Sequence, residues 1–192
     1  MGYLAYFFQR KNTILFIQIA SVLILVSTAL TWVTATGLPQ SAAADEVTLS
    51  GGEMASTIRS MGLVGVAGGV AATIATGWLR GLIGAVIFGA SIVSFIGSVL
   101  ALINPAAAAA PALAEYTGIT EPAGQYSVGF AVWLALFGSV LLVISSLAML
   151  LFSPGWSDAK SSKKYTRGKP GAQNPDEIDM WDDLSDGQDP TH

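Results

Sequence analysis

The sequence predicts an all-α membrane protein: a bundle of four transmembrane helices with both termini cytoplasmic and a disordered C-terminal tail. Only 11% of the 192 residues are charged, whereas soluble domains average about 25%. Hydrophobic residues make up 52% of the chain. Because about 20 apolar residues cross a bilayer, each of the four long stretches without Asp, Glu, Lys or Arg is long enough to span it: 12–44, 60–79, 81–114 and 122–157.

The first helix is expected over residues 13–33. Its basic start at Arg10 and Lys11 also suits a signal peptide. The apolar segment of a signal peptide is only about 7–15 residues long, and the run here is longer. We therefore expect this segment to be retained as a transmembrane helix.

The other helices are expected over 51–79, 82–103 and 127–152, which completes a transmembrane domain over 1–152. Ser50 followed by Glu53 has the spacing of a capping box. The second helix should therefore begin near Gly51, outside the membrane. A very short turn around 78–81 should join it to the third helix.

The orientation follows from the positions of the basic residues. With four crossings, all Lys and Arg residues except Arg59 fall on one side of the membrane. Basic residues favour the cytoplasmic side, so we expect both termini to be cytoplasmic. The tail, 153–192, has a basic block followed by an acidic block.

Rows of small residues predict where helices pack, because helices in lipid associate by close approach. Residues four apart form one such row in the second helix and another in the third: Gly65, Gly69 and Gly77, and then Gly81, Ala85, Gly89 and Gly97. The rows predict a tight hairpin of these two helices. The alternative is that one row mediates a homodimer.

The composition excludes several kinds of chemistry. The chain has no Cys, and its single His is His192, the last residue, so we expect no metal site, no cofactor and no catalytic residues. No span contains an ionisable side chain, whereas coupled transport usually uses one. The sparse basic residues argue against nucleic-acid binding, and the lipid bilayer is the expected partner.

Two sets of residues remain as candidate sites. Trp32, Glu53 and Arg59 flank the outer ends of the first two helices and form a candidate outer polar site. In the acidic block, Trp181 and Leu184 are three residues apart, so a short helix would put both on one face. Since Trp is enriched where partners bind, we expect this segment to contact a protein partner.

Several segments resemble the tryptophan-associated transmembrane protein family of actinobacteria. They are Thr31-Trp32-Val33-Thr34, Ser50-Gly51-Gly52-Glu53, Gly77-Trp78-Leu79-Arg80 and the tail from Trp181 to Thr191. The resemblance implies a multi-pass protein of the bacterial plasma membrane, encoded beside tryptophan-biosynthesis genes, and it carries over no catalytic residue. Because the resemblance extends to Thr191, it also implies that Asp189 and Pro190 belong to the partner-binding tail motif.

Two functions fit these observations. The first is a membrane accessory, scaffold or regulatory protein whose tail recruits a cytosolic partner linked to tryptophan metabolism. The alternative is a small component of a transporter or exporter for tryptophan or a related aromatic metabolite, suggested by polar residues in the first helix such as Gln18 and Thr28.

Overall fold

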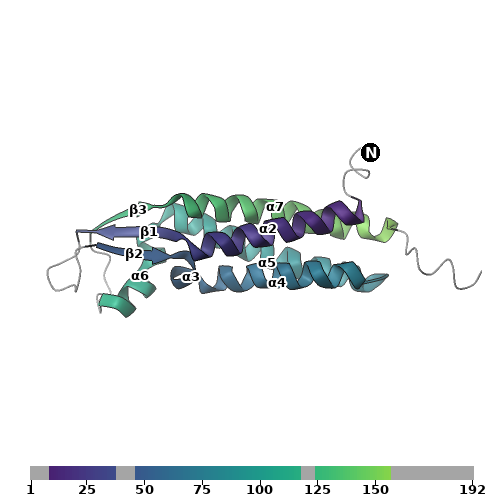
Figure 1. Ribbon diagram of the computed structural model, residues 1–192, viewed down its shortest axis with the longest axis horizontal. Coiled ribbons are helices and arrows are strands. Elements are labelled where there is room, and N and C mark those ends of the chain that lie inside the picture. Colours follow the sequence, from purple (N-terminus) through teal and green to yellow (C-terminus); the bar gives the residue numbers. More distant parts are fainter. Residues whose placement is uncertain (1–8, 38–45, 118–123, 157–192) are drawn as a thin grey trace, which may run out of the picture. The chain divides into compact units, whose positions relative to one another are not determined.

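Four long apolar helices dominate the computed structural model, which describes residues 9–37, 46–117 and 124–156 (Figure 1). Their length and composition confirm the predicted number of spans. They are α2 (Arg10–Ala29), α4 (Ser56–Ile74), α5 (Trp78–Ile103) and α7 (Phe130–Phe152). A 3-10 turn, η1 (Ser153–Gly155), follows α7. Trp156 is the last described residue, so the rest of the predicted tail lies outside the described part of the chain.

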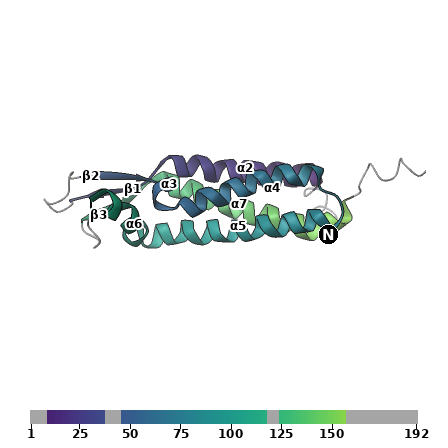
Figure 2. The same ribbon diagram turned by 90° about the horizontal axis from the view of Figure 1, so that it is seen from below.

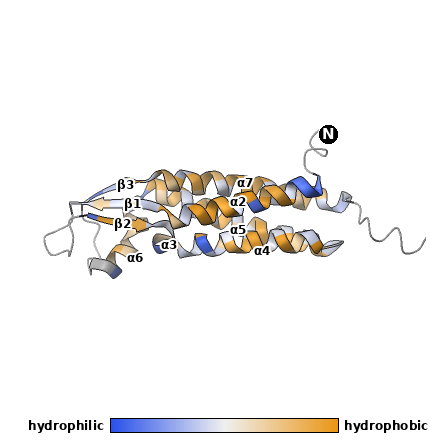
Figure 3. Ribbon diagram, viewed as in Figure 1, coloured by the Kyte–Doolittle hydropathy of each residue, from blue (hydrophilic) through white to orange (hydrophobic). Residues whose placement is uncertain are grey.

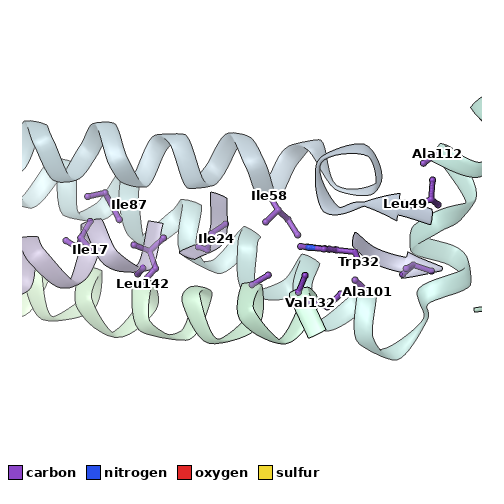
Figure 4. Packing of buried hydrophobic residues seen from close by; sticks show 14 of the residues in the cluster. Ile17, Ile24, Trp32, Leu49, Ile58, Ile87, Ala101, Ala112, Val132 and Leu142 are labelled. Atoms are coloured by element: carbon purple, nitrogen blue, oxygen red, sulfur yellow. The ribbon is translucent and has the colours of Figure 1, made fainter. Parts of the chain in front are cut away.

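The four helices pack in chain order as a ring. Helix α2 contacts α4 and α7, and α5 contacts the same two helices, as in an up-and-down bundle with short connections. Figure 3 shows hydrophobic colour along all four helices. Apolar side chains from three of the helices meet in the interior, as Figure 4 shows for Ile17, Ile24, Ile87 and Leu142. The order of packing, which the sequence did not reveal, is therefore defined.

The boundaries of the helices correct the sequence prediction. The first helix ends at Ala29 rather than at 33, because Leu30 is extended and a β-strand follows. The predicted helix 51–79 is divided at Ala55 into α3 (Gly51–Met54) and α4. The turn between α4 and α5 lies earlier than 78–81, at 75–77, where Gly77 has a φ of +56° that favours glycine.

A three-stranded antiparallel sheet, which the sequence analysis missed, lies at one end of the bundle (Figure 1). Its strands are β1 (Thr31–Thr36), β2 (Glu46–Ser50) and β3 (Gln125–Val128), in the order β2-β1-β3. The register pairs Thr34 with Thr48 on one side and with Ser127 on the other. The sheet therefore links the end of α2 to the beginnings of α3 and α7.

Helix α6 (Pro105–Thr117) covers part of this sheet. It lies in the connection between α5 and β3, where no helix was predicted, and it contacts β2 and β3. Leu113 of α6 and Ala35 of β1 are both buried and belong to one apolar cluster. Because Pro105 stands at the first helical position, its missing N–H costs no hydrogen bond there.

The rows of small residues do not pair with each other as predicted. Gly65 and Gly69 of α4 face α2, where an added Cβ at position 65 would overlap Ser21 Oγ. In α5, a Cβ added at Gly81 or at Gly89 would meet nothing within 4 Å. The α4–α5 hairpin instead forms through Gly97, a member of the predicted α5 row, and through Gly68, which lies outside the rows.

Gly68 of α4 and Gly97 of α5 are the glycines at which these two helices approach closely. A Cβ at Gly68 would lie 2.7 Å from Ile87 Cγ1, and one at Gly97 would lie 2.7 Å from Ile58 Cδ1. The remaining members of the predicted rows have different settings, since Gly77 forms the turn and Ala85 is exposed. The predicted hairpin forms, but most members of the two rows do not mediate it, because a spacing of four residues identifies a helix face but not the helix that it meets.

Gly65→Ala should destabilise the bundle, because the new methyl group has no room beside Ser21. We expect a loss of about 1–3 kcal/mol, the usual cost of overpacking a core. The measurement is thermal unfolding of the purified full chain in detergent. Gly89→Ala is the matched control in α5, and an equal loss in that variant would contradict the packing described here.

Candidate functional site

Trp32 is a structural residue at the junction of α2 and the sheet. Its side chain is fully buried, and its indole Nε1–H donates to the carbonyl oxygen of Ser27 at 2.9 Å and to Ser27 Oγ at 3.1 Å. The ring lies so close to Gly51 that any Cβ there would overlap it. Figure 4 shows the indole pointing into the bundle near Ile58.

An apolar cavity of about 280 Å³ lies beside this indole. Residues of α4, α5 and α6 complete its wall, among them Ile58, Gly97 and Ala108. The open space exists partly because Gly97 carries no side chain. Its lining contains no ionisable group and, beside the indole, one polar side chain, that of Thr57.

Glu53 and Arg59 line a different cavity, of about 490 Å³, together with Leu25, Thr28 and Leu63. The structure thus brings two of the three predicted outer-site residues to one cavity, whereas Trp32 does not line it. The charged pair lies where α2, α3 and α4 meet. The side chain of Arg59 lies beside Gly52, where an added Cβ would be 3.7 Å from Arg59 Nη1.

Glu53 has a clear structural role in this cavity. Its Oε2 accepts hydrogen bonds from the backbone N–H of Ser50 at 2.7 Å and from Ser50 Oγ at 2.6 Å. In return, its own backbone N–H donates to Ser50 Oγ at 3.3 Å. The predicted capping box is therefore confirmed, and it accounts for the spacing of Ser50 and Glu53.

Most polar side chains inside the bundle bond to nearby backbone, whereas the buried hydroxyls of Thr13 and Ser94 have no hydrogen-bond partner among the described residues. Ser21, Ser139 and Ser146 each donate to the carbonyl oxygen four residues earlier in their own helix. Gln18 of α2 donates through Nε2 to the carbonyl oxygen of Val66 in α4 at 3.4 Å. These residues therefore serve helix geometry and helix packing, because backbone bonds occupy their donors.

Arg80 is the charged residue whose importance the sequence analysis missed. It begins α5 and is only 1% exposed. Its Nη2 donates to the carbonyl oxygen of Ala75, at the end of α4, at 3.0 Å. Its Nη1 reaches the carbonyl oxygens of Ser153 at 3.5 Å and Trp156 at 3.4 Å, beyond the end of α7.

We call these contacts of Arg80 with Ala75, Ser153 and Trp156 the Arg80 clamp. The guanidinium also lies 5.6 Å from the centre of the Trp156 ring, within the range of a cation–π interaction. One side chain thus joins the ends of α4 and α7 to the start of α5. The signal in the sequence was a single charged residue just after the short connection between two apolar helices.

The other sequence predictions bear on metals and on the tail. Within the described residues, no group of three or more His, Cys, Asp or Glu could hold a metal ion. The proposed tail motif lies outside the described residues. No structural statement is therefore made for its members, Trp181, Leu184, Asp189 and Pro190.

A family model of tryptophan-associated transmembrane proteins matches residues 14–191. The chain belongs to the tryptophan-associated transmembrane protein family. The matched range includes nearly all of α2, the other three spans and the tail with Trp181 and Leu184. No curated protein and no solved structure matches the chain significantly. The family and the four spans together establish a multi-pass membrane protein.

In this family member, Arg80→Lys should loosen the Arg80 clamp. A Lys ammonium cannot reach the three carbonyl groups together or stack as a planar group on Trp156. We expect a loss of about 2 kcal/mol, typical of hydrogen bonds from a charged donor. Thermal unfolding in detergent measures it, with Arg59→Lys at an exposed position as the control. Equal stability of the Arg80→Lys chain would contradict the clamp.

Proposed function

We propose that this protein is a membrane-bound accessory or scaffold protein rather than an enzyme, and that its C-terminal tail recruits a cytosolic partner. The partner would be a protein linked to tryptophan metabolism, in keeping with the name of the family. The Arg80 clamp is the observation that carries the proposal. It ties Trp156, the last described residue and the fourth of the tail, to the ends of two membrane helices.

An attachment point fixed in this way suits a recruiting role. A partner that binds the tail is held at the membrane, where its effective concentration beside other membrane-bound molecules rises without any new contact. The basic block, from Lys160 to Lys169, follows within a few residues of Trp156. Each such residue contributes about 1 kcal/mol of attraction to an anionic membrane surface, which would keep the tail near the lipid.

We propose that both termini face the cytoplasm of a bacterial cell. Arg10, Lys11 and Arg80 lie at the ends of their helices on the same side of the bundle, and Arg59 lies at the other. The tail adds its basic block to the first group. This distribution supports the proposed orientation through the preference of basic residues for the cytoplasmic side.

The contacts of the polar residues in α2 favour this proposal over transport of an aromatic metabolite. Gln18 bonds to α4, and Thr28 donates to the carbonyl oxygen of Leu25 in its own helix. Trp32 is fully buried, and its indole N–H is bonded to Ser27. The residues that motivated the transporter hypothesis therefore have structural partners, and the tail becomes the better candidate for function.

The acidic end of the tail supplies the chemistry for recognition. Trp181 and Leu184 stand three residues apart among Asp and Glu residues, and a helix formed on binding would put both on one face, which suits a partner with an apolar groove and a basic rim. The charges would also keep the segment in solution until it binds. A homodimer of the membrane domain would present two such tails side by side.

Trp181→Ala combined with Leu184→Ala should abolish recruitment, because hot-spot side chains each carry about 2 kcal/mol or more of binding energy. The measurement is crosslinking of the tagged full chain in the cells that produce it, followed by mass spectrometry of captured proteins. We expect at least a tenfold loss of the captured partner, and the same loss when Asp176 to His192 are removed.

Tyr165→Ala, in the basic block, is the matched control and should leave capture unchanged. Identical captured proteins from the intact and the truncated chains would overturn the recruiting role. Uptake and export of labelled tryptophan, measured in a deletion strain, test the alternative. If deletion changes tryptophan uptake or export, each variant is then expressed in the deletion strain. Return of normal transport with both Tyr165→Ala and the double variant would favour the transport function instead.

A further inference from the structure

A cavity of about 480 Å³ lies between α2 and α4, at the end of the bundle where α2 begins. Figure 2 shows these two helices side by side over their length. The cavity runs about 12 Å along α2, given a rise of about 1.5 Å per residue from position 10 to position 18. Its lining residues are Arg10, Lys11, Ile14, Leu15, Gln18 and Thr73.

The mouth of this cavity is positively charged and has no acidic side chain among its lining residues. Arg10 is held in place, because its Nη2 donates to the carbonyl oxygen of Thr73 near the end of α4. A guanidinium has five N–H donors, so this bond positions the group and leaves donors for a ligand. The neighbouring Lys11 is exposed and adds a second positive charge.

Beyond the two cations, the cavity becomes apolar. Ile14 is partly buried, and Leu15 is 56% exposed on the surface that faces lipid. Gln18 closes the far end, because its side chain bonds to Val66 across the groove. Both helices are long and apolar enough to cross a membrane, so we expect the charged residues at their ends to lie at the headgroup level. A ligand here meets cations at the headgroup level and an aliphatic wall below them.

We propose that this cavity binds an anionic phospholipid of the leaflet on that side. The phosphate would lie between Arg10 and Lys11, and the upper part of an acyl chain would lie along Ile14 and Leu15. Basic pockets between transmembrane helices are suited to anionic headgroups. The unbalanced charge calls for an anion, and the adjoining apolar wall selects a lipid over a free ion.

The cavity at the opposite end of the same two helices provides the contrast. There Arg59 shares its cavity with the carboxylate of Glu53, so the lining has no net charge from these two residues. That cavity should therefore not prefer an anionic lipid. The acidic block of the tail is an alternative anionic ligand for the Arg10 cavity. The experiment below distinguishes binding of this block from binding of a lipid.

The test follows the thermal stability of the purified full chain in detergent during titration with dioleoylphosphatidylglycerol or dioleoylphosphatidylcholine. We expect the anionic lipid to raise Tm at lower concentration than the zwitterionic one. Lys11→Gln should raise the half-saturating concentration of the anionic lipid about fivefold, which corresponds to about 1 kcal/mol per basic residue. This variant retains the bond from Arg10 to Thr73, so its folding is not at risk.

Arg10→Gln combined with Lys11→Gln should remove the preference for the anionic lipid, and Arg59→Gln is the matched control that retains it. Equal stabilisation by both lipids, or an unchanged titration in Lys11→Gln, would overturn the proposal. An equal effect of inorganic phosphate alone would show that no lipid is required and would overturn it as well. The proposal would also be overturned if the anionic lipid raised Tm only after the tail carboxylates were changed to amides, because the tail itself would then be the ligand of the cavity.

Discussion

Helix ends that meet a membrane surface must satisfy backbone groups that have no partner within the helix. At the end of the bundle where α4 finishes, two arginines do this. Arg10 bonds to the carbonyl of Thr73, and Arg80 bonds to that of Ala75 and to Ser153 beyond α7. A positive charge beside carbonyl ends also suits the helix dipole. These arginines therefore connect all four helices, and they do so by binding backbone carbonyl groups that lack partners within the helices, at the ends of α4 and α7.

At the opposite end of the bundle, backbone hydrogen bonds of the sheet satisfy and connect the helix ends. The sheet follows α2 in the chain, and backbone hydrogen bonds join it to the neighbouring helices. The N–H of Gly51 donates to the carbonyl oxygen of Leu30 at 3.2 Å, and the N–H of Gly129 donates to the carbonyl oxygen of Trp32 at 2.7 Å. Ser27 Oγ bonds to the carbonyl of Ala131, at the start of α7. The indole of Trp32 fills the space beneath the sheet, so this end of the bundle is closed by hydrogen bonds and one large ring.

Local features of this protein could be predicted from its sequence, whereas features that depend on pairing could not. The spans and the capping box of Ser50 and Glu53 follow from charge-free length and from a spacing of three residues. The sheet pairs β1 with β3, which are separated by two spans, and Thr31–Thr36 reads as the end of an apolar run. Likewise, nothing local to Arg80 indicates that it reaches Trp156. For the candidate sites, Glu53 and Arg59 share a cavity as their placement suggested, but Trp32 belongs to the interior.

The sheet also has a consequence for the way the protein is assembled during synthesis. Strands β1 and β2 emerge on one side of the membrane as soon as the first helix has crossed it, and they can pair as a hairpin. Strand β3 reaches that side only after α5 has brought the chain back, and Gly129, just before α7, then bonds to Trp32. Completion of the sheet therefore requires that the later helices be inserted in the correct direction, and a chain with a missed insertion would leave the β3-facing edge of β1 unpaired.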